Sequence, residues 1–107
     1  MIIYEQLDVT AADGDSTVDV AFTSTNELRR TLKMVQINDN SSDLDLLVYD
    51  ERELIADIPC DINPFNDKWI EFDRPIEVGH QVKLGIRNNT GGSVTAAISY
   101  ATNIEER

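Results

Sequence analysis

The stretch from Gln81 to Ala101, QVKLGIRNNTGGSVTAAISYA, decides the fold class of this chain. Apolar residues alternate with polar or small ones on both sides of a turn rich in Asn and Gly: Val82, Leu84 and Ile86 before it, and Val94, Ala96, Ile98 and Tyr100 after it. Successive side chains of a strand point to opposite faces of a sheet, so this alternation is typical of strands with one buried face. Asn and Gly tolerate the positive φ of tight turns, and we therefore predict an antiparallel hairpin here.

The same pattern recurs about every ten residues, which is the spacing expected of a β-sandwich or barrel. We predict strands over residues 2–9, 17–22, 30–38, 44–50, 53–58, 69–73, 82–88 and 93–101. A weak helical pattern over residues 25–34 is interpreted as a turn that leads into a strand. Short polar turns between the strands favour antiparallel pairing. The predicted fold is therefore all-β: an antiparallel two-sheet β-sandwich, jelly-roll-like, of about eight strands, with an immunoglobulin-like sandwich as the alternative.

The predicted facing of two strands follows from their alternation. Within residues 17–22 it places Val18, Val20 and Phe22 on one face. Within residues 44–50 it directs Leu44, Leu46 and Val48 inward and Asp45 outward.

A chain of 107 residues is expected to form a single domain, residues 1–107, in which the charged end NIEER (103–107) is a frayed tail. Cys60 is the only cysteine, which excludes an intrachain disulfide and favours a small buried hydrophobe. His80 is the only histidine, so Cys60 and His80 are the one candidate catalytic dyad, and nothing in the sequence places them together. We predict a protein that is not an enzyme and that needs no cofactor.

The charge is strongly acidic, with 20 Asp and Glu against 9 Lys and Arg and a net charge of −11. Such a surface repels nucleic acid and anionic membranes, so neither is an expected partner. No stretch approaches the roughly 20 apolar residues that span a bilayer, and the start MIIYEQ lacks the pattern of a signal peptide. Asp outnumbers Glu and Arg outnumbers Lys, which favours a halophilic origin because molar salt screens the self-repulsion.

Two acidic turns offer hard oxygen ligands for a cation such as calcium. One contains Asp13 and Asp15, and the other contains Asp39 and Asp43. A third set of oxygen donors lies in the longest irregular stretch: Asp61, Asn63, Asn66 and Asp67. Solvated turn carboxylates are the alternative for all three.

Asn40 and Asn88 each begin a glycosylation sequon within a predicted turn, for which turn chemistry is the alternative.

Two groups of side chains could contact a partner. Trp69 lies near Phe65 and Phe72 in the sequence and could form a sugar-stacking platform, or it could cap one end of the core. Arg29 and Arg30 could dock a negatively charged partner through bidentate pairing, or they could form a local ion pair with Glu27 or a neighbouring strand.

Two long segments resemble small β-sandwich proteins found on virus particles: LKMVQINDNSSDLDLLVYD (32–50) and WIEFDRPIEVGHQVKLGIRNNTGG (69–92). Together with the acidic surface, the chain resembles the decoration or turret proteins of tailed viruses that infect halophilic archaea. The resemblance implies a jelly roll on the virion surface that forms trimers or pentamers and binds the major capsid protein or other virion subunits. It carries no catalytic residues over to this chain.

The hypothesis from the sequence is therefore a non-catalytic structural virion protein whose strand edges and apolar ends contact neighbouring subunits. The N-terminal segment Ile2, Ile3 and Tyr4 and the 59–68 loop, which contains Pro64 and Phe65, are the expected contact regions, together with Arg29, Arg30 and Trp69. A carbohydrate-binding module or adhesin is the alternative, and it requires an exposed aromatic platform that includes Trp69.

Overall fold

The computed structural model describes residues 1–61 and 69–106, and in these residues it contains eight strands and no helix. The described residues therefore contain no helix that is long and apolar enough to cross a membrane. The strands coincide with the eight predicted ranges, and the last one extends further: β1 (Ile2–Ala11), β2 (Ser16–Thr23), β3 (Leu28–Ile37), β4 (Leu44–Asp50), β5 (Glu53–Pro59), β6 (Ile70–Pro75), β7 (Gln81–Asn88) and β8 (Val94–Glu106). The predicted all-β class is confirmed, and residues 28–34 are strand rather than helix.

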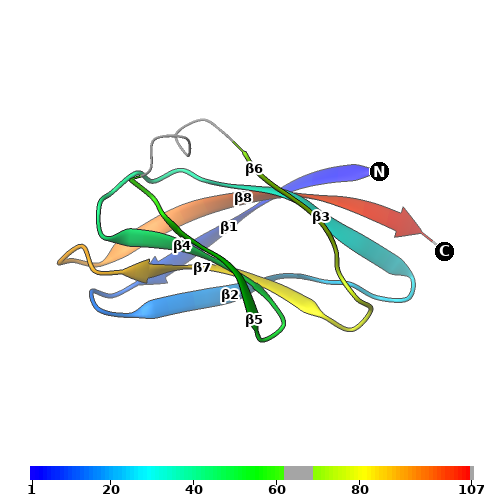
Figure 1. The fold of residues 1–107 in the computed structure, drawn as a ribbon, viewed down its shortest axis with the longest axis horizontal. Coiled ribbons are helices and arrows are strands. Elements are labelled where there is room, and N and C mark those ends of the chain that lie inside the picture. The colour runs from blue at the N-terminus through cyan, green and yellow to red at the C-terminus, as the bar shows by residue number, and fades with distance from the viewer. Residues whose placement is uncertain (62–68, 107) are drawn as a thin grey trace.

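The strands form two four-stranded antiparallel sheets that face each other (Figure 1). Sheet A has the order β1-β8-β3-β6, and sheet B has the order β2-β7-β4-β5. The antiparallel pairs are nested, with β4–β5 innermost and β3–β6, β2–β7 and β1–β8 around it. A long hairpin that is rolled up in this way is a jelly roll.

The core lies between the sheets and is filled by the alternate, inward-pointing residues of both. Its largest fully buried side chains are aliphatic: Val9, Leu32, Val35, Ile37, Leu44, Leu46, Val48, Val82, Leu84, Ile86 and Ile98. Each such side chain contributes about 1.5–3 kcal/mol through burial. The Tyr100 ring stacks on Phe22, and its hydroxyl donates to the carbonyl of Ala21 at 2.9 Å, which joins the two sheets.

The predicted hairpin of residues 81–101 is wrong, because β7 lies in sheet B and β8 lies in sheet A. Asn88 explains the crossing. Its side chain is fully buried, and Nδ2 donates to the carbonyls of Ala11 (2.9 Å) and Gly92 (2.7 Å). Its Oδ1 accepts from the backbone N–H of Thr90 at 3.0 Å. The turn is therefore pinned to the end of β1, and the amide that a glycan would modify is already engaged.

The predicted frayed tail is also wrong over residues 103–106, because these residues continue β8. Asn103 pairs with Ile2 of β1, and Glu105 pairs with Arg29 of β3. The N–H of Ile104 donates to the carbonyl of Met1 at 2.8 Å. Pairing with β1 reaches Ile104 and pairing with β3 continues to residue 106, and these contacts hold the segment in the sheet.

The predicted facing of β2 holds for Phe22 and fails for Val20, which is 46% exposed. A register shift between Val20 and Phe22 in the β2–β7 pairing inserts one residue, and this β-bulge reverses the alternation. Val18 and Val20 pair with Gly85 and Lys83 and lie on the outer face of sheet B, whereas Phe22 pairs with buried Val82.

Candidate functional site

The outer face of sheet A carries a strip of side chains without charge. Because Ile98 and Tyr100 of β8 point into the core, the residues of β8 that alternate with them point outward. The register places outward residues of β1 and β3 beside them, with Gln6 and Gln36 on either side of Ser99. We define the uncharged strip as Ile2, Tyr4 and Gln6 of β1, Met34 and Gln36 of β3, and Ala97, Ser99 and Asn103 of β8; Ala101, between Ser99 and Asn103, is already buried.

The uncharged strip is unusual in a chain whose net charge is −11. Charged side chains lie at its margins: Asp8 is opposite Ala97, Glu71 is opposite Met34, and Lys33, which precedes Met34 at the register shift in β3, is ion-paired with Asp73 of β6. Removing water from amides, hydroxyls and methyl groups costs much less than removing it from carboxylates, and the cores of protein interfaces are depleted of charge. Covering these side chains therefore costs less desolvation free energy than covering a surface of carboxylates.

An aromatic pair lies on the same face. Tyr4 of β1 and Trp69, which immediately precedes β6, meet with ring centroids 5.7 Å apart and an interplanar angle of 65°. β1 and β6 are opposite edges of sheet A, so the two side chains reach toward each other across the face. They border a shallow hollow of ≈ 270 Å³ that Glu5, Gln6 and Ser99 also line. The structure thus places Trp69 on the outer face and not at an end of the core.

The other predicted contact residues have mixed outcomes. Ile2 is 50% exposed and Ile3 is half-buried, both on β1. Arg29 is exposed and pairs across the strands with Glu105. Arg30 forms an ion pair, but neither with Glu27 nor with an adjacent strand: its Nη1 lies 3.3 Å from Glu5 Oε1 of β1, which β8 separates from β3, and its guanidinium lies 5.2 Å from the centroid of the Phe22 ring. Pro64 and Phe65 lie outside the described residues.

The four aspartates proposed as cation ligands lie in two turns at the end of the sandwich opposite the chain termini. Their backbone or side-chain groups take part in the hydrogen bonds and the backbone conformation of those turns. Asp13 Oδ1 accepts from the N–H of Gly91 at 2.9 Å, and Asp39 Oδ1 accepts from the N–H of Ser41 at 2.8 Å. Asp43 has a φ of 62°, and Asp15 accepts from the N–H of Asn88 through its backbone carbonyl.

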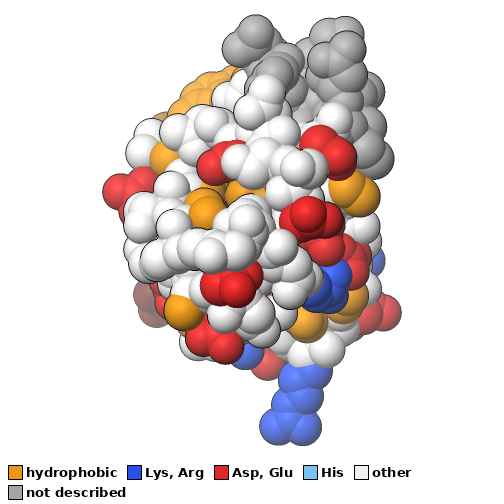
Figure 2. Space-filling view, turned by 90° about the vertical axis from the view of Figure 1, so that its left-hand side faces the viewer, with side chains coloured by type: hydrophobic (Ala, Val, Ile, Leu, Met, Phe, Trp, Pro, Cys, Tyr) orange, Lys and Arg blue, Asp and Glu red, His pale blue; other side chains and the backbone are white. Residues whose placement is uncertain are grey.

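Figure 2 shows acidic side chains at this end separated by uncharged surface. Within residues 1–61 and 69–106, no three His, Cys, Asp or Glu side chains form a group that could hold a metal ion. The third predicted set lies mostly in residues 62–68, outside the described part.

Cys60 and His80 do not form a dyad. The N–H of Cys60 donates to the carbonyl of Leu44 at the start of β4, whereas His80 contacts Asp50 at the end of β4. The thiol is buried, and burial together with the nearby carboxylates of Asp39 and Asp45 raises the pKa of Cys60 to about 12. A thiol in this environment stays protonated at neutral pH and is not a nucleophile.

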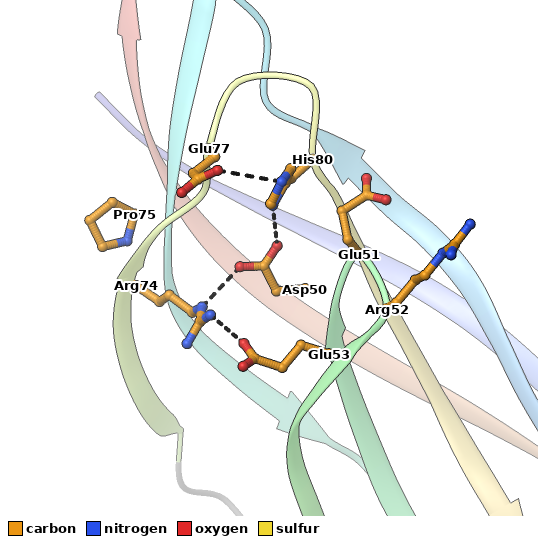
Figure 3. Close-up of a pocket in the computed structure, with 8 residues that line it drawn as sticks. All are labelled: Asp50, Glu51, Arg52, Glu53, Arg74, Pro75, Glu77 and His80. Carbon is orange, nitrogen blue, oxygen red and sulfur yellow. Dashed lines mark hydrogen bonds and ion pairs between the residues drawn. The ribbon is translucent and has the colours of Figure 1, made fainter.

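A cluster that the sequence did not indicate surrounds Asp50 at the other end of the sandwich (Figure 3). The Asp50 carboxylate is 8% exposed; Oδ2 lies 3.0 Å from Arg74 Nε, and Oδ1 lies 3.0 Å from His80 Nδ1. His80 Nε2 is 3.5 Å from Glu77, and Arg74 Nη2 is 2.7 Å from Glu53. The hydrogen bond that Arg74 donates to the Asp50 carboxylate is the main cause that raises the pKa of Arg74.

These residues line a cleft of ≈ 460 Å³ between the β4–β5 turn and the β6–β7 loop. None of its described lining residues is Ser, Thr or Cys, so His80 has no hydroxyl or thiol in the cleft to activate. The ion pair between Asp50 of β4 and Arg74 of β6 links sheet B to sheet A, and this geometry indicates a structural role for the cluster. Asp50 lies 24 residues before Arg74 and 30 residues before His80 in the sequence, and no motif connects the three.

No family model matches the chain, and no curated protein matches it. A similar solved structure is that of PliG from Aeromonas hydrophila, a periplasmic lysozyme inhibitor of g-type lysozyme. The two chains are 12% identical, the match covers 95% of this chain and 86% of that chain, and the TM-score is 0.44. A similarity at this level carries no argument about function.

Proposed function

We propose that this chain is a non-catalytic structural protein of a virus particle, a capsid decoration or turret protein, that binds other virion subunits through the outer face of sheet A. The observation that carries the proposal is the uncharged strip. A protein with 20 acidic residues that has no carboxylate among these outward residues of β1, β3 and β8 presents a surface suited to burial.

The size of the strip is consistent with this role. It spans outward residues of three adjacent strands, and neighbouring strands lie about 4.8 Å apart. A stable protein interface buries about 800 Å² on each partner, so the strip with its margins and the Tyr4–Trp69 pair would form the centre of such a contact. Jelly rolls occur in viral capsid proteins, and they also occur in lectins, so the fold alone does not decide between these functions.

The acidic remainder of the surface supports a protein that works in concentrated salt, where charge repulsion between densely arranged copies is screened. We place the protein on the virion surface of a virus that infects a halophile, with the major capsid protein or another virion subunit as its partner. The resemblance noted in the sequence also favours trimers or pentamers.

The experiment that tests this proposal measures the chain in density-purified particles of the source virus. Quantitative mass spectrometry should find it at a fixed ratio to the major capsid protein, and its absence from the particles would refute the proposal.

A matched pair of variants then tests the face. Ser99→Glu places a carboxylate in the uncharged strip, and we expect it to weaken binding to particles at least about tenfold. Ser16→Glu makes the same change on β2 of sheet B, opposite Arg87, and should bind like the unmodified chain. Equal binding by both variants would show that the outer face of sheet A is not the contact.

Carbohydrate binding is the second candidate, and the Tyr4–Trp69 pair beside its hollow favours it. Stacking of a sugar ring on these aromatics would change the emission of Trp69, which is the single tryptophan. Titration with a panel of polysaccharides tests this candidate. Trp69→Phe is the control, because this variant has no tryptophan and shows any background emission of the polysaccharides. Emission that stays constant across the panel would remove it.

A further inference from the structure

The four edge strands of the sandwich differ in how well they are protected against pairing with another chain. β6 has six residues, ends at Pro75, and has a register shift in its pairing with β3. β5 ends at Pro59 and has a shift in its pairing with β4, and β2 has the shift described above. Bulges, prolines and short length are the usual devices that prevent edge-to-edge association.

β1 lacks these devices. It has ten residues without proline, and its register with β8 is unbroken from Ile2 to Ala11. No strand among the described residues pairs with its other side. Two large apolar side chains are exposed along it, Ile2 at 50% and Tyr4 at 63%. An edge of this kind is a template for another strand.

The direction of the free backbone groups of β1 follows from its first residue. Met1 and Ile104 exchange two hydrogen bonds, with N···O distances of 2.8 and 3.3 Å. Hydrogen-bonded and non-hydrogen-bonded pairs alternate along an antiparallel ladder. The N–H and C=O groups that point away from β8 therefore belong to Ile2, Tyr4, Gln6, Asp8 and Thr10.

Charge and length together favour one self-pairing of β1, because the pairings centred on Tyr4 or on Leu7 also keep like charges apart but use fewer of the edge-facing residues. An antiparallel pair centred on Glu5 or on Asp8 would place two carboxylates directly opposite each other, which is destabilising. A pair centred on Gln6 places Tyr4 opposite the partner's Asp8 and Ile2 opposite the partner's Thr10. This register uses all the edge-facing residues and sets no like charges opposite each other.

We infer that two copies of this chain associate by antiparallel pairing of their β1 strands, centred on Gln6, so that the two A sheets form one continuous eight-stranded sheet. The pairing is isologous and closes as a two-fold dimer. It would join the two uncharged strips into one surface, and in this respect it rests on the proposed function. It differs from the trimer or pentamer that the resemblance implies.

Salt controls this dimer. Each copy has a net charge of −11, so two copies repel each other at low ionic strength. At about 1 M salt the Debye length falls to about 3 Å, and the repulsion is screened. We therefore expect sedimentation equilibrium of the isolated chain to show dimer at about 2 M KCl and monomer at about 0.05 M KCl.

Hydrogen exchange measured by NMR tests the register residue by residue. Amides of Ile3, Glu5, Leu7 and Val9 donate to β8 and should be slow in monomer and dimer alike. Amides of Tyr4, Gln6, Asp8 and Thr10 should be fast in the monomer and at least about tenfold slower in the dimer. The salt is held constant, and the protein concentration selects the state.

Gln6→Pro removes an edge-facing N–H that β8 does not use, and we expect it to raise the dimer dissociation constant at least about tenfold. Gln6→Ala keeps that N–H and is the matched control, with a dissociation constant within about twofold of the unmodified chain. If Gln6→Pro fails to fold, the exchange pattern of the unmodified chain still decides the question.

A monomer at all salt concentrations, a trimer or pentamer, or a dimer whose edge-facing amides stay fast would each overturn the inference. A dimer with the alternating exchange pattern supports it even when the chain is absent from virus particles, an outcome that would refute the proposed function alone. A chain that is monomeric in solution but present in virus particles would refute the dimer and support the proposed function.

Discussion

Gly85 is the position at which the sandwich should tolerate substitution least. It lies in β7 between Val18 of β2 and Leu47 of β4. A Cβ added there would overlap the carbonyl oxygen of Thr17 and would lie 2.6 Å from both Cα and Cγ1 of Val18. Ordinary carbon–carbon contacts are about 3.5–4.0 Å, so Gly85→Ala forces the β2 backbone away by about 1 Å.

The expected loss of stability follows from this displacement. Overpacking costs about 1–3 kcal/mol, and the loss of two ladder hydrogen bonds beside Thr17 and Val18 adds about 0.5–1.5 kcal/mol each. We therefore expect Gly85→Ala to lower the free energy of unfolding by about 2–6 kcal/mol. Small domains have about 5–15 kcal/mol in total, so the variant should be marginally stable.

Urea denaturation at constant KCl, followed by circular dichroism, measures this loss. Gly92→Ala is the matched control, because nothing lies within 4 Å of a Cβ at Gly92, and we expect a change within about 0.5 kcal/mol. A loss below about 1 kcal/mol for Gly85→Ala, or equal losses for the two variants, would refute the close approach of β2 and β7.

Three further predictions concern stability. Asn88→Ala removes both donors to the buried turn and should cost about 2–4 kcal/mol in urea denaturation, whereas Asn89→Ala, whose side chain is exposed, should cost little. Burial raises the folded-state pKa of Cys60 to about 12 and also raises that of Tyr100, so the stability that both protonated groups provide is complete below pH ~9 and is lost as the pH rises toward 12. Cys60→Ala should make this alkaline loss shallower, and an identical pH profile would contradict the assignment. The melting temperature of the monomer should rise with KCl up to about 1 M because the net charge is −11, and a flat dependence would argue against the halophilic interpretation.

The strands could be predicted from the sequence because one face of each is buried, and burial imposes a period of two. Pairing partners could not be predicted in the same way. The alternation in β7 and β8 is the same whether they share a sheet or face each other, and the buried amide of Asn88 decides the matter through contacts with Ala11 and Gly92. The facing of β2 failed at Val20 because a bulge leaves no local trace in composition.

The contact residues of the candidate site were predicted in part. Tyr4 and Trp69 were both proposed, but their meeting depends on the order of strands in sheet A, which only the fold supplies. The uncharged strip was missed because it combines alternate residues of three strands that are distant in sequence. The cluster around Asp50 was missed because Arg74 of β6 and His80 before β7 meet Asp50 of β4 only through the packing of the two sheets.

The nested pairing of the strands has a consequence for how the chain folds. β4 and β5 can pair as soon as both exist, whereas each surrounding pair closes a longer loop, and β1 must wait for β8. Such high contact order predicts slow folding, in which the outermost ladder is completed last. During synthesis on the ribosome β1 is made before the other seven strands and has no pairing partner until β8 emerges. Until then, β1 of one nascent chain can pair with a strand of another chain, which is domain swapping.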